Sequence, residues 1–403
     1  MKNIDTAGSK KPFVPTKKTL IFLLIASIPS LLGAAAISSV LPLISEAFPD
    51  VPESIISLIV TLPPLATAIA GFFTGALADK IGPKKVLIIG ILLFSLAGGA
   101  AFFMNSVPAI LVTRAVLGIG MAGIMPMVLV LLTRYYSGEE QARNLGLFAG
   151  TMGIGGMLLG LACGCLAGVS WRAAFLIYFV CLLIVPGVIF FLRDPGPAQE
   201  SPQTQEADAA PVSRRKTIWT VILVYVVLAY SMVLLYTIST KIPYLLTEMA
   251  DVDPWVSALI IGLLGFCGAL GGFAYPKFRN FTYKARMGLM LAFGAIGLFI
   301  VSTSLNIVVV GIGVALVGFG NGLGSPIAAQ WLASVTSEKI RGKIMGGMSA
   351  ITYAGMFAST FITTAILFFV SDYSVMYLVL GIITAVIAIL LFVIGKNRMP
   401  KHN

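Results

Sequence analysis

The chain has 403 residues, of which 58% are hydrophobic and 11% are charged, and its mean hydropathy is +0.99. A soluble domain carries far more charge on its surface, so this composition excludes one and indicates an integral membrane protein. The net charge of +11 would suggest a nucleic-acid partner in a soluble protein, but the placement of the basic residues, described below, argues against nucleic acid.

Twelve long apolar runs follow one another along the chain, and a single membrane helix needs roughly 20 apolar residues. The runs are much too long for barrel strands, and an open strand in lipid would leave backbone groups unpaired. We therefore predict an all-α membrane protein with twelve transmembrane helices, at residues 19–45, 54–78, 85–104, 107–133, 144–168, 172–192, 217–247, 255–275, 286–304, 306–332, 342–370 and 374–395.

Basic residues cluster before the first run, in alternate gaps and after the last run, and these segments together hold 24 of the 27 Lys and Arg residues. The other gaps carry acidic residues instead, among them Glu46, Glu53, Glu248 and Asp372. Because short cytoplasmic loops are enriched in Lys and Arg, this alternation predicts that both termini are cytoplasmic. The compact loops favour a bacterial cytoplasmic (inner) membrane.

Residues 194–216 form a long polar segment rich in Pro, Gln, Ala and acidic residues, which is typical of a flexible linker. It separates two halves, residues 1–193 and 217–403, with six predicted spans each. The halves share a register at an offset of 200, in which Gly118 and Gly120 match Gly318 and Gly320. The sequence therefore predicts two pseudo-symmetric six-helix bundles that rock about a central site.

Glycine stripes run along the fifth and eighth predicted spans. Small residues let helix backbones approach closely in lipid, so the stripes predict either ordinary close packing or the moving interface between the bundles. They comprise Gly156, Gly160, Gly164 and Gly168 in the fifth span, and Gly262, Gly265, Gly268 and Gly271 in the eighth.

A short polar gap at 75–85 reads GALADKIGPKK and fits the pattern G-x-L-x-D-[RK]-x-G-x-[RK]-[RK] through Gly75, Asp79, Gly82, Lys84 and Lys85. This pattern resembles the loop motif of major facilitator superfamily transporters. The resemblance implies that these five residues act in gating, with the Asp79 carboxylate accepting hydrogen bonds from a helix N-terminus while the carrier is open to the outside.

The resemblance extends over essentially the whole chain and is nearest to the bacterial drug:proton antiporter-like branch. Arg114, Gly118 and Gly120 match its R-x-x-x-G-x-G pattern in the fourth span. The fifth span departs from the antiporter pattern, because Leu161 follows Gly160 where a Gly-Pro pair is usual.

No constellation for catalysis or redox chemistry is present in the sequence. The only histidine is His402, all four cysteines lie in apolar runs, and no phosphate-binding loop or metal-ligand spacing occurs. We therefore predict a protein that is not an enzyme, needs no cofactor or metal, and draws its energy from gradients.

Two basic residues, Arg114 and Lys241, lie well inside predicted spans. A charge at a helix centre costs roughly 2.5–3.5 kcal/mol on insertion scales, so each needs a reason. We predict that both face one cavity and hold an organic anion. The alternatives are that Lys241 reaches the outer surface along its stem, and that Arg114 bonds backbone or hydroxyls such as Ser38.

Other polar residues in the spans complete the predicted substrate site, which comprises Arg114, Lys241, Tyr230, Thr237, Ser38, Asn321 and Tyr353. The prediction is a monomeric secondary active transporter that moves a small organic anion by alternating access, by exchange or export. Its partners are the substrate and membrane lipid, with no nucleic acid. A proton-coupled multidrug efflux antiporter is the alternative, and a receptor that keeps the carrier fold is a third possibility.

Overall fold

The computed structural model describes residues 15–29, 37–194, 214–250, 252–278, 280–303 and 306–396, and these residues contain helices and no strand. Eleven of their helices are long and apolar enough to cross a membrane. These eleven correspond to the second to twelfth predicted spans. The first predicted span falls on shorter pieces, and its middle, residues 30–36, lies outside the described residues.

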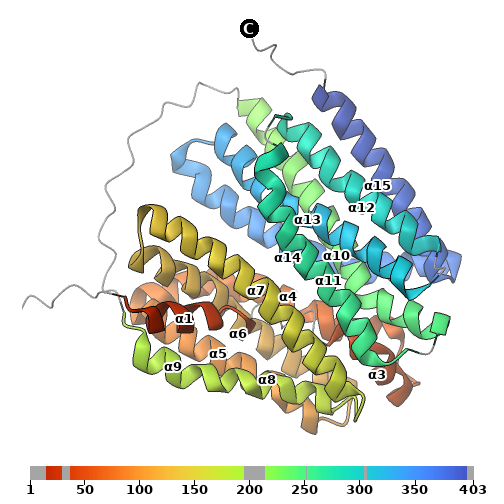
Figure 1. Cartoon of the computed structure of the whole chain (residues 1–403), viewed down its shortest axis with the longest axis horizontal. Helices are drawn as coiled ribbons and strands as arrows, with labels where there is room; N and C mark the ends of the chain where they lie inside the picture. The colour runs from red at the N-terminus through yellow and green to blue at the C-terminus, as the bar shows by residue number, and fades with distance from the viewer. Residues whose placement is uncertain are drawn as a thin grey trace, which may run out of the picture.

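The first half of the chain forms one group of helices, which we call the N-bundle (Figure 1). Its sixth span, Ala173–Phe191, joins short α-helical and 3₁₀ segments into one rod. The α-helices of this bundle are α1 (Lys17–Ile25), α3 (Leu41–Ala47), α4 (Glu53–Ile81), α5 (Pro83–Ala100), α6 (Val107–Tyr135), α7 (Gly138–Ala167), α8 (Ile177–Val180) and α9 (Ile184–Phe191).

The second half forms the C-bundle, drawn from light green to blue in Figure 1. Its helices are α10 (Arg214–Ala250), α11 (Pro254–Ala274), α12 (Tyr283–Thr303), α13 (Ile307–Val335), α14 (Glu338–Val370) and α15 (Tyr373–Lys396). The predicted linker lies mostly outside the described residues. Helix α10 begins at Arg214, so the last three residues assigned to the linker are helical, which hydropathy could not reveal because they are charged.

The internal repeat has a physical basis in matching helix contacts. A Cβ on Gly118 of α6 would lie 2.4 Å from the Pro63 carbonyl of α4, and one on Gly318 of α13 would lie 2.3 Å from the Leu264 carbonyl of α11. Gly120 and Gly320 likewise approach the backbones of α5 and α12. The repeated glycines are therefore the points where equivalent helices touch, and the two bundles share one packing plan.

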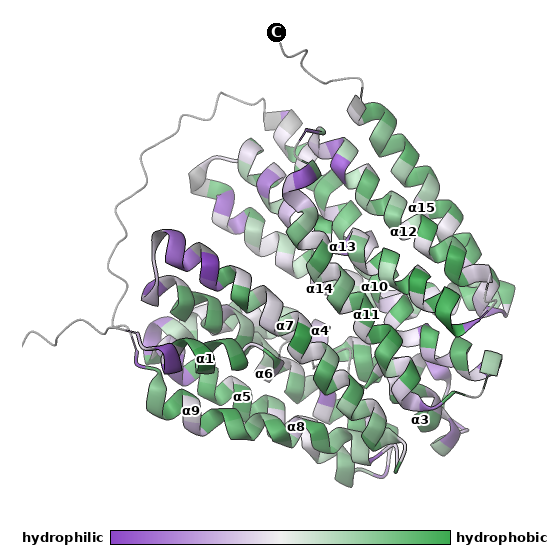
Figure 2. Ribbon diagram, in the orientation of Figure 1, coloured by the Kyte–Doolittle hydropathy of each residue, from purple (hydrophilic) through white to green (hydrophobic). Residues whose placement is uncertain are grey.

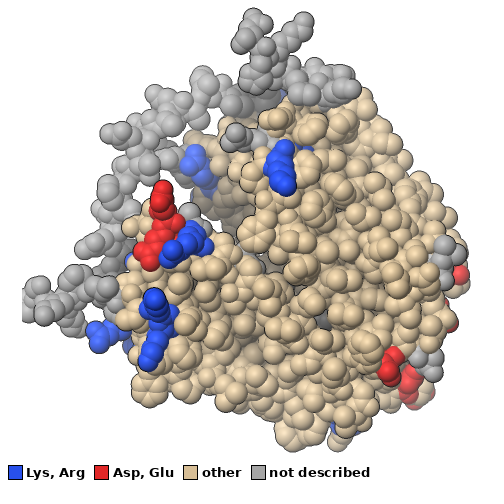
Figure 3. Space-filling model, viewed as in Figure 1, with Lys and Arg blue, Asp and Glu red and all other residues tan. Residues whose placement is uncertain are grey.

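The two ends of the molecule differ in charge. We call the end with the α4–α5 and α13–α14 turns the basic end, and the end with Glu53, Glu248 and Asp372 the acidic end. Most of the ribbon between them is apolar on its outside, as Figure 2 shows. The bundles meet toward the acidic end and stand apart at the basic end, where Figure 3 shows the surface hollowed between them.

Candidate functional site

A cavity of about 450 Å³ lies between the bundles and is lined by residues of both. Seven methionines contribute to its wall, and glycines of α7, α11 and α13 widen it. Asp, Glu, Lys, Arg and His are absent from the described residues that line it. Methionine side chains are flexible and polarizable, so this wall can adapt to apolar ligands of different shapes.

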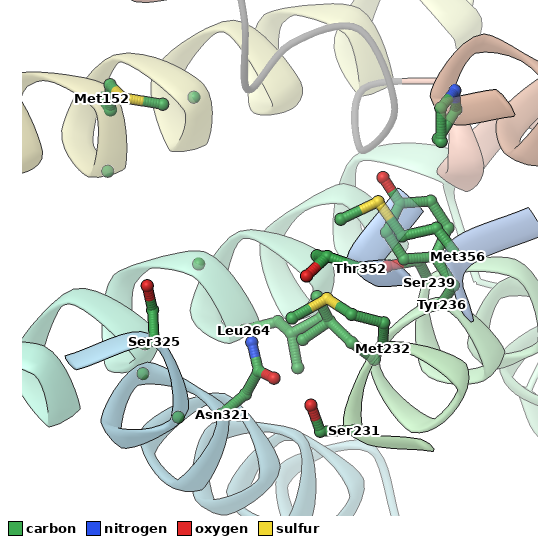
Figure 4. A pocket seen from close by; sticks show the side chains of 18 of the residues that line it. Met152, Ser231, Met232, Tyr236, Ser239, Leu264, Asn321, Ser325, Thr352 and Met356 are labelled. Carbon is green, nitrogen blue, oxygen red and sulfur yellow. The ribbon is translucent and has the colours of Figure 1, made fainter. Parts of the chain in front are cut away.

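Polar groups lie mainly on the C-bundle side of the cavity. Figure 4 shows Ser231 of α10 and Asn321 of α13 near each other, with Met152 on a helix across the cavity. The Ser231 hydroxyl donates to the Leu228 carbonyl at 2.8 Å, so its oxygen is left as an acceptor. The side-chain oxygen of Asn321 is buried and accepts no hydrogen bond from the described residues. This wall can therefore accept hydrogen bonds from a ligand.

Of the seven residues predicted to bind substrate, the structure places Asn321 and Tyr353 at this cavity. The other predicted polar residues lie elsewhere. Tyr230 shares a 2.8 Å hydrogen bond with Thr384 of α15, Thr237 donates to the Val233 carbonyl at 2.7 Å, and Ser38 is buried in the 3₁₀ turn before α3. Helical spacing predicts that Tyr230 and Thr237 share one face of α10. In the structure that face packs inside the C-bundle.

Arg114 does not line the cavity, which corrects the prediction that it faces the substrate site. It is fully buried inside the N-bundle, and its Nη2 donates to the Gly98 carbonyl at 2.6 Å. Gly98 lies in the last turn of α5, where carbonyls carry partial negative charge. The guanidinium carbon also lies 5.0 Å from the centre of the Phe175 ring and 4.8 Å from that of Tyr178. The bond to Gly98 matches the structural alternative of a backbone bond, while Nε and Nη1 of Arg114 find no hydrogen-bond partner among the described residues.

Lys241 is also absent from the cavity lining, because its ammonium is engaged at a contact between the bundles. Its Nζ lies 2.5 Å from Oε1 of Glu53, at the start of α4, and 3.2 Å from Oγ of Ser57. Lys241 is 1% exposed, so its stem does not carry the charge to the surface. The prediction that Arg114 and Lys241 hold one anion therefore has no support in this arrangement.

Sequence reasoning missed Glu53, which lay one residue outside the predicted second span. Its second oxygen accepts a 2.6 Å hydrogen bond from the Tyr373 hydroxyl at the start of α15. We call Glu53, Ser57, Lys241 and Tyr373 the Glu53 cluster. Because α4 belongs to the N-bundle and both α10 and α15 to the C-bundle, the cluster holds the bundles together at the acidic end.

Two further hydrogen bonds cross between the bundles on the same side of the molecule. Ser45 of α3 and Tyr244 of α10 share a bond of 2.7 Å, and Thr61 of α4 and Thr360 of α14 share another of 2.7 Å. All three contacts join helices of opposite bundles. Each has to break if the bundles are to separate at the acidic end.

The five predicted gating residues lie at the basic end. Asp79 and Lys85 are exposed, and Asp79 makes no hydrogen bond or ion pair with the part of the chain that the structure describes. Gly75 also faces open space, since a Cβ there would have nothing within 4 Å. Asp79 lies eighteen residues after Thr61, or five helical turns, so both lie on the face of α4 toward α14.

Gly82 and Lys84 have a structural role in this conformation. Gly82 has a φ of +91°, which favours glycine, and a Cβ there would lie 2.9 Å from an Asp194 oxygen. That oxygen accepts from the Lys84 backbone N–H at 3.0 Å and so caps α5. The Lys84 ammonium donates to the Ile189 carbonyl at 2.8 Å near the end of α9. The α4–α5 turn is thus fastened to the end of the sixth span.

The glycines of the two stripes make two kinds of helix contact. Gly164 of α7 packs against α11, since its Cβ would lie 2.7 Å from the Ala258 Cβ, and Gly262 of α11 faces Met157 of α7. Gly268 and Gly271 instead approach α13 within the C-bundle. The α7–α11 contact therefore joins the bundles, as one interpretation of the stripes required, and the second half of the α11 stripe serves close packing inside one bundle.

Comparison with known proteins places this geometry in a family. A family model for the Major Facilitator Superfamily matches residues 23–336. The chain is 26% identical over 260 residues to the inner membrane transport protein YnfM of Escherichia coli (strain K12), covering 64% of this chain. It is 28% identical over 180 residues to the quinolone resistance protein NorB of Staphylococcus aureus (strain JH9), covering 44% of this chain. The matched stretches span 61% and 38% of these two relatives.

The fold resembles the crystal structure of a bacterial homolog of the human lysosomal transporter Spinster in an inward-facing, unoccupied conformation. The TM-score is 0.73 at 16% identity, and the match covers 98% of this chain and 100% of that one. At this identity the likeness shows the fold alone. Together with the family match over most of the chain, it identifies an integral membrane transporter, not an enzyme, that belongs to the Major Facilitator Superfamily.

Proposed function

We propose that this protein is a monomeric secondary active transporter that moves a small, uncharged, amphipathic organic molecule by alternating access. The observation that carries the substrate class is the cavity between the bundles, whose described lining has no charged side chain and seven methionines. A monomer suffices, because the cavity and the contacts that close it belong to one chain.

Three acceptors in the cavity favour a substrate that donates hydrogen bonds, beside hydroxyls such as those of Ser325 and Tyr353, which can also donate. The hydroxyls of Ser231 and Thr352 donate hydrogen bonds to the Leu228 and Met348 carbonyls, so the hydroxyl oxygens remain available as acceptors. The buried oxygen of Asn321 has no donor among the described residues. Leaving such an acceptor unpaired costs about 1–3 kcal/mol, so a ligand with an N–H or O–H group gains what the empty site lacks. Amides, amines in their neutral form and alcohols fit this pattern.

An anionic substrate, the first expectation from the sequence, has less support from this geometry. An anion in an apolar cavity needs a cation within reach, and the two candidate cations are committed elsewhere. Arg114 bonds Gly98 in the N-bundle core, and Lys241 pairs with Glu53. Transport of an anion would require one of them to leave its partner in each cycle.

We further propose that the basic end faces the cytoplasm of a bacterial cell, with both termini on that side. The alternation of charge along the chain supports this orientation. The present conformation is then open to the cytoplasm and closed to the outside by the Glu53 cluster. In the opposite state the cluster separates, and Asp79 approaches the N-terminus of α14 on the face it shares with Thr61.

Matched pairs of ligands test the substrate class directly. A library of aromatic amides and the carboxylates of the same rings, such as benzamide and benzoate, is screened for thermal stabilisation of the purified protein. We expect the stabilising members to be uncharged donors, and we expect Asn321→Leu to reduce their effect. Stabilisation by carboxylates alone, surviving Asn321→Leu and lost in Lys241→Gln, would restore the anion proposal.

Proton-driven export of lipophilic drugs is the second candidate. The methionine-rich cavity favours it, and the name of the matched protein NorB points the same way. Measuring substrate flux in proteoliposomes distinguishes proton-driven export from substrate exchange. If export is driven by protons, an imposed proton gradient should drive the substrate against the substrate's concentration gradient. Glu53→Gln should abolish this proton-driven transport and leave substrate counterflow intact. Flux indifferent to the proton gradient would exclude this candidate.

A further inference from the structure

A second hollow, apart from the central cavity, lies between α4 and α6. It has a volume of about 660 Å³ and is lined by apolar residues except for Thr74 and Lys80. The Thr74 hydroxyl donates to the Gly71 carbonyl at 3.0 Å, so it offers no free donor. We call this hollow the α4–α6 groove.

The groove opens to lipid and away from the central cavity. Its α6 wall is formed by Ala115 and Ile119, whereas Met121 on the same helix lines the cavity. Residues 119 and 121 differ by about 200° around a helix, so the two hollows lie on opposite sides of α6. The groove walls include Ile69 and Phe73 of α4, which are 57% and 70% exposed. In a membrane such side chains contact acyl chains.

The dimensions of the groove match one leaflet of a bilayer. Its α4 wall runs from Ala66 to Lys80, which is about 21 Å at the rise of an α-helix. Half of the hydrocarbon core is about 15 Å thick, and the headgroup region adds several ångströms. The groove therefore extends from near the middle of the membrane to the basic end, where the helix meets the headgroups.

A lysine lies at the mouth of the groove. Lys80 is in the last turn of α4, is exposed, and has no hydrogen bond or ion pair with residues in the described ranges. Among the described residues that line the groove, Lys80 is the only one with a charged side chain. The neighbouring Lys84 is engaged with the Ile189 carbonyl, whereas the Lys80 ammonium is available at the level of lipid phosphates.

We propose that the α4–α6 groove binds one anionic phospholipid of the leaflet at the basic end, with an acyl chain along α4 and α6 and the phosphate paired with Lys80. The site does not depend on the identity of the transported substrate. It also lies about 120° around α4 from Thr61, the residue that contacts α14, so rocking of the bundles leaves it open to lipid.

Lipid binding to the purified full-length protein tests the site. Phosphatidylglycerol and phosphatidylcholine with identical acyl chains are titrated in detergent, and bound lipid is counted by native mass spectrometry. We expect the protein to prefer phosphatidylglycerol. Lys80→Gln should weaken phosphatidylglycerol binding about fivefold, the effect of one lysine near a membrane surface, and leave phosphatidylcholine binding unchanged.

Two further variants separate the headgroup from the chain. Lys277→Gln removes an exposed lysine from the corresponding turn of the C-bundle and should change neither affinity. Ala115→Phe fills the groove and should weaken binding of both lipids. Equal affinity for the two lipids in the unmodified protein, or an undiminished preference in Lys80→Gln, would overturn the proposal. Unchanged binding of both lipids to Ala115→Phe would also overturn it.

Discussion

At the scale of single residues, we propose that Asn321 contacts the substrate. It lines the cavity, and its buried oxygen has no donor among the described residues. We predict that Asn321→Leu lowers affinity for an uncharged donor ligand about tenfold, the value of one good hydrogen bond, without loss of thermal stability. Ligand-induced thermal shifts measure this. Unchanged affinity would remove Asn321 from the site.

Arg114 should behave in the opposite way, because its contacts lie in the N-bundle core. We predict that Arg114→Met destabilises the protein by roughly 1–3 kcal/mol, since the Gly98 carbonyl loses its charged donor, and leaves ligand affinity unchanged. Thermal unfolding with and without ligand gives both quantities. A loss of affinity at unaltered stability would return Arg114 to the substrate site.

Glu53 and Lys241 form an ion pair that joins the two bundles. In Glu53→Gln, Lys241 stays buried without a carboxylate, so the closed acidic end becomes costly. We predict that this variant shifts the protein toward the state open at the acidic end, and that adding Lys241→Met reverses much of the shift. Spin labels on the two bundles at the acidic end report the populations.

The coupling between the two substitutions should be at least about 1 kcal/mol, since they remove partners of one buried contact. Lys241→Met alone should have a smaller effect than Glu53→Gln, because Glu53 is 31% exposed and water can solvate its free carboxylate. Additive effects of the two changes would mean that the pair does not close the molecule.

We propose that helix α4 carries contacts for both conformations. Thr61 contacts α14 in the present state, while Gly75 and Asp79 lie on nearly the same face and are open at the basic end. We predict that Gly75→Leu leaves thermal stability unchanged, because nothing lies within 4 Å of its Cβ, and lowers transport more than tenfold by blocking closure.

Transport of the isolated variant in proteoliposomes measures the effect of Gly75→Leu. Val386→Leu, which adds one methylene to an exposed face of α15, serves as the matched control and should transport normally. Normal transport by Gly75→Leu as well would show that this face of α4 does not approach the other bundle.

Over the whole molecule, most of the fold can be predicted from the sequence, whereas five of the seven residues predicted to bind substrate lie away from the cavity. Apolar runs, charge alternation and the glycine register report properties of single helices and of the repeat, and eleven spans agree with the structure. Gly118 and Gly318 could be recognised because equivalent helices must touch at equivalent points. Asn321 and Tyr353, which the sequence predicts to bind substrate, both line the cavity, and their role stays a prediction.

The errors arose where one side chain depends on a distant one. Nothing local to Lys241 reveals that Glu53, 188 residues away, lies beside it. Hydropathy also excluded Glu53 from its helix, although it is the first residue of α4. The groups that contact the Arg114 guanidinium, the last turn of α5 and two aromatic rings, come from other helices, so the sequence around Arg114 does not reveal them. Periodicity identifies faces of a helix, but tertiary packing decides which face meets the cavity.

Access to the cavity from both sides of the membrane tests alternating access most directly. Ser231 lies near the middle of α10 and lines the cavity, and Ser231→Cys in a background without native cysteines gives it a unique thiol. A membrane-impermeant thiol reagent is applied to oriented vesicles from each side in turn. The account predicts labelling from both sides, with Gly75→Leu abolishing labelling from the acidic end alone. Labelling from one side only in the otherwise unmodified protein would contradict it.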